Sequence, residues 1–410
     1  MSAVQLETSA PIRHAKLRDT AQRLGTTNPD YQVRCRVFDH RGEQVASYTT
    51  CFIGVGAALF LLGLVLPLVP LSFERDASAG TSDLSPLPDH PSIDVIIPAY
   101  LEGSIVAQKV EQCRRALDAC EVTGRVIVVA SGDETVAAAR LADEVIVVPP
   151  AGKPLAINRG VAASDADICV VSDANCLVEP VTWPKLIGRS LGTAGLVSGQ
   201  KTEAGGAEHA FWRLERLYKR RSQSRGSLSV AGEFMAFRRG SFREIPLNSW
   251  CDDLWLSIDF HLRGLPVVVD TEVLTTEAAP ERRDQWFRRT RMSEGLMREL
   301  FPRVGVLARS GAGRELMAHK LYRQTFGCFG FWTAAVGLAS LMPLALQSGA
   351  FVCLVGSIAA YRGAVREPAI VRPFVTLLGL QMVPVVAATS IVAKWASGTV
   401  HTPGWRKVPR

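Results

Sequence analysis

The stretch ICVVSDAN, residues 168–175, places a short apolar run directly before two oxygen-bearing side chains, Asp173 and Asn175. A short run rich in β-branched residues is typical of a buried strand. Three similar runs precede it: IDVIIP (93–98), RVIVVA (125–130) and EVIVV (144–148). Helical stretches lie between these runs, at 105–119, 134–142 and 155–163. Strands that alternate with helices predict an α/β fold with a mostly parallel sheet covered on both faces.

Polar side chains that follow the predicted strands are the candidates for chemistry, because open α/β sheets bind ligands at the carboxyl ends of their strands. Asp173 and Asn175 could hold Mg²⁺ or Mn²⁺ against a diphosphate. Magnesium typically takes one or two carboxylates, and phosphate oxygens and water complete its shell. The alternative is a turn in which the two side chains only cap local N–H groups. The pattern alone leaves both interpretations open.

The other strand ends carry weaker signals. Pro98 is expected to stop the first strand, after which the Tyr100 ring could stack on a base and Glu102 could accept a hydrogen bond from a base or ribose. Asp133 follows the second strand, and Lys153 stands where a loop enters a helix. A helix start favours phosphate because its dipole and free N–H groups add to the lysine charge. Taken singly, such residues are more often solvated side chains.

Asp252 and Asp253 open an amphipathic helix predicted for residues 253–262. Acidic residues in the first turn of a helix commonly only cap it. Paired carboxylates beside a bound ligand also suit general base catalysis. Asp253 is therefore a candidate to deprotonate an acceptor hydroxyl.

The basic segment QWFRRTRM, residues 285–292, places Arg288 and Arg291 on one helix face. Two guanidinium groups could stabilise a leaving diphosphate, because planar bidentate donors match phosphate oxygens. The alternative is an interfacial helix with arginines at lipid headgroups and apolar residues in the acyl boundary.

Hydrophobic residues make up 48% of the 410-residue chain and concentrate in four uncharged runs, 51–71, 325–346, 349–361 and 373–393. About 20 apolar residues cross a bilayer, so three runs are long enough, and the third would be a short tilted span or a re-entrant piece. We therefore expect three or four transmembrane helices in a multi-pass membrane protein. The expected organisation is a polar segment (1–50), a transmembrane helix (51–71), a linker (72–91), a catalytic domain (92–300), an interfacial region (301–323), transmembrane helices (324–394) and a tail (395–410).

The net charge is +7, and basic residues flank the apolar runs at 309–323 and 362–372. The positive-inside tendency then predicts a cytoplasmic catalytic domain. A conflict arises at the N-terminus, which is also basic through Arg13, Lys16, Arg18, Arg23, Arg34, Arg36 and Arg41. Either the first run does not cross the membrane or the charge tendency fails there. Since zinc-finger spacing and aromatic-rich basic helices are missing from the sequence, we expect no nucleic-acid partner.

Other sequence features narrow the class of protein. Nine cysteines without a C-x-x-C pair favour a reducing compartment. The sequence has no G-x-G-x-x-G after a strand and no G-x-x-x-x-G-K-[ST], which argues against a dinucleotide enzyme and a P-loop NTPase.

Taken in order, the segments P-A-Y-x-E (98–102), G-K-x-x-A-x-N (152–158), Asp173-Ala174-Asn175, Asp252-Asp253 and the arginine-rich segment resemble the family 2 glycosyltransferases, whose catalytic domain has the GT-A fold. Residues 212–233 resemble the acceptor-side region of membrane-bound members, and residues 405–410 resemble a tail found in some of them. The resemblance implies that Pro98, Tyr100, Glu102 and Asp133 border the nucleoside. It further implies that Lys153 meets the phosphates, Asp173 and Asn175 meet ribose and metal, and Asp253 is the base of an inverting displacement. The diphosphate would be held by Arg288, Arg289 and Arg291.

The sequence also departs from the family pattern at three places. Ala130 stands where many members have a base-binding Asp, Asn175 replaces a second Asp, and Met292 follows Arg291 where processive polymer synthases have an Arg-Trp pair. We therefore expect one or a few transfers per acceptor, from a UDP- or GDP-sugar to a hydroxyl of a glycan or lipid-linked acceptor, in cell-envelope or exopolysaccharide synthesis. The alternatives are a polyprenyl-phosphate sugar transferase and a catalytically silent membrane scaffold.

Overall fold

The computed structural model describes residues 40–66, 84–204, 215, 228–278, 282–363 and 368–398. The chain divides into two compact units, residues 1–48 and 49–410. Apart from the beginning of helix α2 (His40–Val65), everything described here belongs to the second unit. Most of the predicted N-terminal segment, most of the linker, much of the acceptor-side region and the tail at 399–410 lie outside the described residues, whereas residues 40–50 of the N-terminal segment belong to α2.

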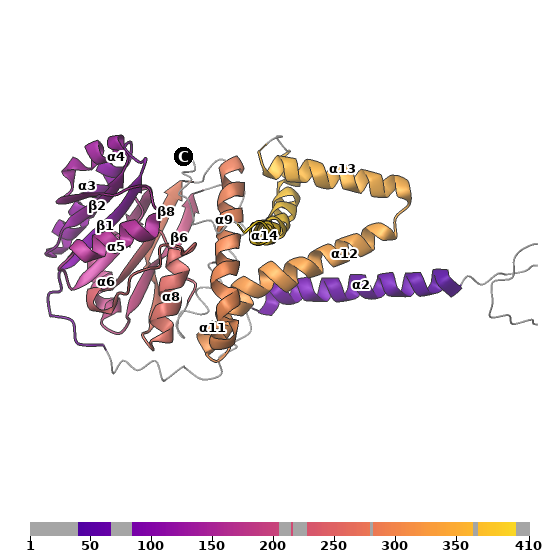
Figure 1. Cartoon of the computed structure of the whole chain (residues 1–410), viewed down its shortest axis with the longest axis horizontal. Coiled ribbons are helices and arrows are strands. Elements are labelled where there is room, and N and C mark those ends of the chain that lie inside the picture. Colours follow the sequence, from indigo (N-terminus) through magenta and orange to yellow (C-terminus); the bar gives the residue numbers. More distant parts are fainter. Residues whose placement is uncertain are drawn as a thin grey trace, which may run out of the picture. The chain divides into compact units, whose positions relative to one another are not determined.

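An eight-stranded sheet with the order β3-β2-β1-β4-β7-β6-β8-β5 is the centre of the described fold (Figure 1). Its strands are β1 (Ile93–Tyr100), β2 (Val126–Ser131), β3 (Glu144–Val147), β4 (Ile168–Ser172), β5 (Cys176–Glu179), β6 (Leu196–Ala204), β7 (Phe234–Arg238) and β8 (Val267–Ala278). The four strands expected from the sequence are β1 to β4, and they are parallel neighbours.

The expectation of a mostly parallel sheet needs correction, because the sheet is mixed. β7 runs antiparallel to β4 and β6, and β5 runs antiparallel to β8, while β6 and β8 are parallel. The sequence pattern missed β6 and β8 because polar and charged residues interrupt them, as in LVSGQKTEA of β6. The α/β class is confirmed.

Pro98 does not stop the first strand, contrary to expectation. β1 continues to Tyr100, and Pro98 is paired with Val129 of β2. On its other side, β1 stays in register with β4 only as far as Ile96. Beyond Ile96 the strand is paired on one side alone, where the missing N–H of a proline is tolerated.

Helices cover both faces of the sheet. They are α3 (Val106–Cys120), α4 (Asp133–Ala138), α5 (Lys153–Ala163), α6 (Trp183–Leu191), α8 (Asp252–Leu262) and α9 (Arg282–Leu300). Because strand side chains alternate, Val95 and Ile97 belong to a buried cluster that includes residues of α3 and α6, whereas Ile96 belongs to a second cluster that includes residues of α5, α8 and α9. Burial of each such aliphatic side chain contributes roughly 1.5–3 kcal/mol to folding, so the strand ends are held on a rigid base.

The C-terminal third of the described chain is helical. It contains α10 (Val304–Leu307), α11 (Gly311–Leu316), a π-helical stretch (Met317–Gly327), α12 (Cys328–Ser340), α13 (Leu344–Tyr361) and α14 (Arg372–Ala396). Short 3-10 helices lie at Ala139–Leu141, Arg239–Ser241, Phe301–Arg303 and Ala369–Val371. In Figure 1, α9 stands between the sheet and these helices.

Two described helices, α13 and α14, are long and apolar enough to cross a membrane. The run at 349–361, expected to be short, lies in an 18-residue helix because the helix already begins at Leu344. The apolar part of α2, Thr49–Val65, falls below the length criterion, and α12 has only 13 residues. By length and composition the described residues thus show two candidate spans, whereas the sequence predicted three or four.

Glycines bring α2 and α12 into backbone contact. A Cβ atom added to Gly56 would lie 2.7 Å from the carbonyl oxygen of Gly330, and one added to Gly330 would lie 2.6 Å from the carbonyl oxygen of Gly56. No side chain fits in this space without moving a backbone. The rings of Phe60 and Phe331 pack beside the contact, 5.2 Å apart. Close approach through small residues is typical of helix pairs in membranes.

Candidate active site

The ends of β1 and β2 bring three of the predicted nucleoside-side residues to one edge of the sheet. Tyr100 is paired with Ser131, so both strands end at the same level. The backbone N–H of Glu102 donates to Thr135 Oγ1 of α4 at 2.8 Å, and Asp133, at the start of that helix, is exposed. Pro98 is buried within β1. The structure thus places Tyr100, Glu102 and Asp133 as the sequence predicted, although their roles stay predictions.

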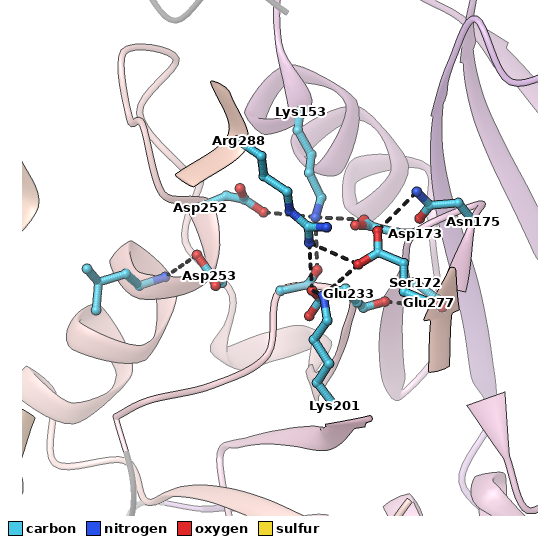
Figure 2. Close-up of polar contacts among 12 residues, drawn as sticks. Lys153, Ser172, Asp173, Asn175, Lys201, Glu233, Asp252, Asp253, Glu277 and Arg288 are labelled. Atoms are coloured by element: carbon cyan, nitrogen blue, oxygen red, sulfur yellow. Dashed lines mark hydrogen bonds and ion pairs between the residues drawn. The ribbon is translucent and has the colours of Figure 1, made fainter. Parts of the chain in front are cut away.

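Lys153 is positioned by the turn that starts α5. Gly152 has φ +107°, a conformation that side chains rarely adopt, and Pro154 follows in the first turn of the helix, where proline is favoured. This turn directs the Lys153 ammonium toward the end of β4. There Nζ lies 2.7 Å from Asp173 Oδ1 and 3.3 Å from Asp252 Oδ2 (Figure 2). It also donates to the carbonyl oxygen of Gly232 at 2.9 Å.

The ammonium of Lys153 therefore joins three segments that are far apart in the sequence. Burial alone would lower the pKa of Lys153, but Asp173 and Asp252 outweigh it and hold the pKa above its ordinary value. The lysine is thus charged in any physiological buffer. Its positive charge compensates the carboxylates of Asp173 and Asp252 at a point where a bound diphosphate would add further negative charge.

Asp253 lies at the edge of this group, at the start of α8. Its Oδ1 accepts the backbone N–H of Leu254 at 2.8 Å. Burial and the neighbouring Asp252 raise its pKa to about 6, against the opposing effect of Lys153. A carboxylate with a pKa close to neutral can take up a proton during reaction and is still ionised at physiological pH.

Gly232 makes room for Asp253. A Cβ atom added to Gly232 would lie 3.0 Å from both Cγ and Oδ2 of Asp253. The same glycine holds the Lys153 ammonium through its carbonyl oxygen. Gly232 belongs to the segment that the sequence assigned to the acceptor side, and its contact with Asp253 could not be predicted from spacing.

A second ionic group lies beside the first and contains the predicted diphosphate ligand Arg288 (Figure 2). The guanidinium of Arg288 lies 2.9 Å from Glu277 and 3.2 Å from Glu233. Lys201 pairs with the same two carboxylates, at 2.5 Å from Glu277 and also in contact with Glu233. Burial would raise the pKa of Glu233, but Lys201 and Arg288 hold it below its ordinary value.

Sequence reasoning overlooked Lys201 and Glu277 as site residues. Both lie inside strands, β6 and β8, rather than after them. The only signal in the sequence was that a lysine and a glutamate lie in strands with a buried face, where charged side chains rarely lack a partner. The two groups adjoin, because the backbone N–H of Asp173 donates to the carbonyl oxygen of Glu233 at 3.0 Å.

The residues that follow β4 include the two predicted ligands of a divalent cation, Asp173 and Asn175. Asn175 Oδ1 is buried and accepts no hydrogen bond from the described residues, while its Nδ2 donates to Glu277 Oε1 at 3.3 Å. Among the described residues, no group of three or more His, Cys, Asp and Glu is arranged to hold a metal. Asp173 and Asn175 would therefore supply two oxygens, and phosphate and water would have to complete the shell.

Arg289 and Arg291 follow Arg288 on α9. Arg289 is half-buried and Arg291 is exposed. Trp286 of the same helix is buried against Tyr361 of α13, with ring centroids 5.9 Å apart. The predicted contacts of Arg289 and Arg291 with a diphosphate stay predictions, and Trp286 packs against α13.

Comparison with protein families identifies the domain that carries this site. Residues 94–246 match the model of the glycosyl transferase family 2. The chain contains a family 2 glycosyltransferase domain. The matched region includes Lys153, Asp173 and Glu233, whereas Asp253 and Arg288 follow it. The prediction that the protein is a glycosyltransferase is confirmed. No curated protein matches the sequence.

Similarity to a solved structure supports the GT-A-like fold. The mannosyltransferase PcManGT from Pyrobaculum calidifontis, in complex with GDP-Man and Mn²⁺, is 19% identical, with a TM-score of 0.60 over 85% of this chain and 99% of that chain. Glucosyl-3-phosphoglycerate synthase from Mycobacterium tuberculosis is 21% identical, with a TM-score of 0.36 over 50% of this chain and 78% of that chain. Mannosyl-3-phosphoglycerate synthase from Rubrobacter xylanophilus is 14% identical, with a TM-score of 0.39 over 56% and 79%. Of these three structures, only PcManGT is similar enough to support the fold.

Proposed function

We propose that this glycosyltransferase moves a sugar from a nucleotide-diphosphate sugar to a hydroxyl of a glycan or lipid-linked acceptor, at a membrane and with inversion. The observation that carries the proposal is the meeting of Lys153, Asp173 and Asp252 within 3.3 Å, next to a half-buried Asp253. These groups come from a helix start, a strand exit and a second helix start. A site that gathers a cation and carboxylates from three segments is suited to a charged, phosphate-bearing donor.

Each side chain has a defined task in this proposal. Tyr100, Glu102 and Asp133 border the nucleoside, and Lys153 and Arg288 face the diphosphate. Asp173 and Asn175 hold Mg²⁺ or Mn²⁺, which would neutralise charge on the leaving group. The buried Asn175 Oδ1 supports this assignment, as does the Mn²⁺ in the PcManGT complex. Asp253 accepts the proton of the attacking hydroxyl while Asp252 stays paired with Lys153.

Membrane attachment is the second part of the proposal. Helices α13 and α14 meet the length and composition of spans. Large apolar side chains of both helices are exposed, among them Leu344 (77%) on α13 and Val392 (62%) on α14. Contiguous exposed apolar surface needs a partner, and a bilayer supplies one. We propose a multi-pass protein with its catalytic domain on the cytoplasmic side, where nucleotide sugars are made.

The test is donor turnover by the full-length protein in detergent or native membranes. GDP-mannose and UDP-glucose would be offered with Mg²⁺ or Mn²⁺, and release of nucleoside diphosphate would be measured. Wild-type protein should be active, and Asp173→Ala and Asp253→Asn should each lose at least 100-fold. Equal inactivity of all three proteins across a wider donor panel would contradict the proposal and favour a silent scaffold. A product cleaved by mild acid would instead identify a lipid phosphate acceptor.

A further inference from the structure

Asn175 and Arg288 would approach the donor from two different segments, yet both contact the same carboxylate. Glu277 Oε1 accepts from Asn175 Nδ2 at 3.3 Å, and Glu277 Oε2 lies 2.9 Å from Arg288. The side chain of Glu277 is 3% exposed. One buried carboxylate of β8 therefore fixes both a predicted metal ligand and a predicted phosphate ligand.

The contact with Asn175 determines which atom of the amide is available. Because Nδ2 donates to Glu277, the amide oxygen is left over, and Oδ1 is the atom without a hydrogen bond from the described residues. A cation needs this oxygen and would be repelled by the NH₂ group. Glu277 thus sets the amide in the only orientation that can serve a metal.

Lys201 and Glu233 complete the arrangement. Lys201 and Arg288 approach Glu233 and Glu277 from opposite sides (Figure 2), so two positive charges meet two negative charges. The side chain of Lys201 is 4% exposed. Removing one member of such a buried group leaves a charge without a partner. The four side chains therefore hold one another in place.

We propose that Glu277 is a positioning residue that, held by Lys201, orients Asn175 toward the cation and Arg288 toward the diphosphate of the donor. This inference rests on the proposed function. It explains why two strands of the sheet carry charged residues in their buried positions. Partners of metal ligands commonly change affinity or activity 10- to 100-fold when mutated, and we expect Glu277→Gln to fall in that range.

The test measures binding of UDP and of GDP to the full-length protein by calorimetry, each with MnCl₂ and with EDTA. Glu277→Gln should weaken binding of the preferred nucleotide about 10- to 100-fold with Mn²⁺ and much less with EDTA. Glu272→Gln is the matched control, because Glu272 lies on the same strand in an exposed pair with Arg189. This variant should bind within twofold of wild type.

A double variant separates positioning from stability. Glu277→Gln leaves the two cations Lys201 and Arg288 with Glu233 alone and should lower the melting temperature. Lys201→Met/Glu277→Gln removes one cation and one carboxylate together, so the melting temperature should return to that of wild type. Weak, Mn²⁺-insensitive binding by the recovered double variant supports the inference. Wild-type affinity in Glu277→Gln, or in the double variant, overturns it. A wild-type chain that binds neither nucleotide overturns the proposed function, and this inference with it.

Discussion

Lys394, near the end of α14, lies 2.7 Å from the buried carboxylate of Glu294 on α9. Its ammonium also lies 4.8 Å from the centre of the Trp250 ring, and Arg298 is at the same distance from that ring. Trp250 comes two residues before Asp252. The last described apolar helix is therefore connected to the loop that precedes Asp252 and Asp253, the predicted catalytic carboxylates.

Replacing Lys394 should weaken this connection. Lys394→Met removes the ammonium that pairs with Glu294 and lies over the Trp250 ring. We expect a loss of about 1–3 kcal/mol in the free energy of unfolding. Lys185→Met, on the exposed surface of α6, is the control and should be neutral. Denaturant unfolding followed by tryptophan fluorescence measures the difference. Equal stability of the two variants would show that the contact contributes nothing.

The pH dependence of activity should report Asp253. Its pKa is raised to about 6 by burial and by Asp252, and a general base acts in its ionised form. Below pH 6, log(kcat/KM) should therefore fall with a slope of about one per pH unit, whereas it should be flat from pH 7 to 8. A profile that stays flat down to pH 4.5 would argue against Asp253 as the base.

Stability should respond to the same carboxyl group in the opposite direction. The folded-state pKa lies above the unfolded value of about 3.9, so the folded state holds the proton more tightly. Its stabilising effect is complete below pH 3.9 and is lost as the pH rises through 6. Asp253→Asn should then be more stable than wild type at pH 8, by about 1–3 kcal/mol, while being inactive. Melting temperatures at pH 8 test this, with Asp118→Asn on α3 as the exposed control.

Gly232→Ala should impair catalysis without unfolding the protein. The added methyl group would meet the Asp253 carboxyl at 3.0 Å and displace it. Since a shift of about 1 Å can reduce a rate 100-fold, we expect kcat to fall about 10- to 100-fold. Gly240→Ala is matched to it, because nothing lies within 4 Å of a Cβ at that position. Unchanged kcat in Gly232→Ala would show that Asp253 has more freedom than the packing indicates.

The sequence predicted the part of the site that follows strands. Asp173 and Lys153 stand at points where an apolar run ends or a helix begins, and both were found in contact. Lys201 and Glu277 could not be found in this way, because they lie within strands whose alternation they break. Their pairing also depends on the parallel contact of β6 with β8, which places Lys201 opposite Thr275. Such register is a long-range property that local patterns do not contain.

The fold was predictable to a similar extent. Strands β1, β2 and β4 are mostly apolar and buried, as expected for strands covered on both faces, and β3 is an apolar strand at the edge of the sheet. The remaining strands are shorter or partly polar, and β5 alternates buried and exposed residues over only four positions. Their mixed parallel and antiparallel arrangement therefore had no clear trace in the sequence.

The contact between Gly56 and Gly330 has a consequence for biogenesis. It joins two helices that precede and follow the whole sheet in the chain. Because translation proceeds from the N-terminus, α2 is synthesised before the sheet. It must persist without its partner while β1 to β8 are synthesised. The helix pair can only close once α12 has also been synthesised.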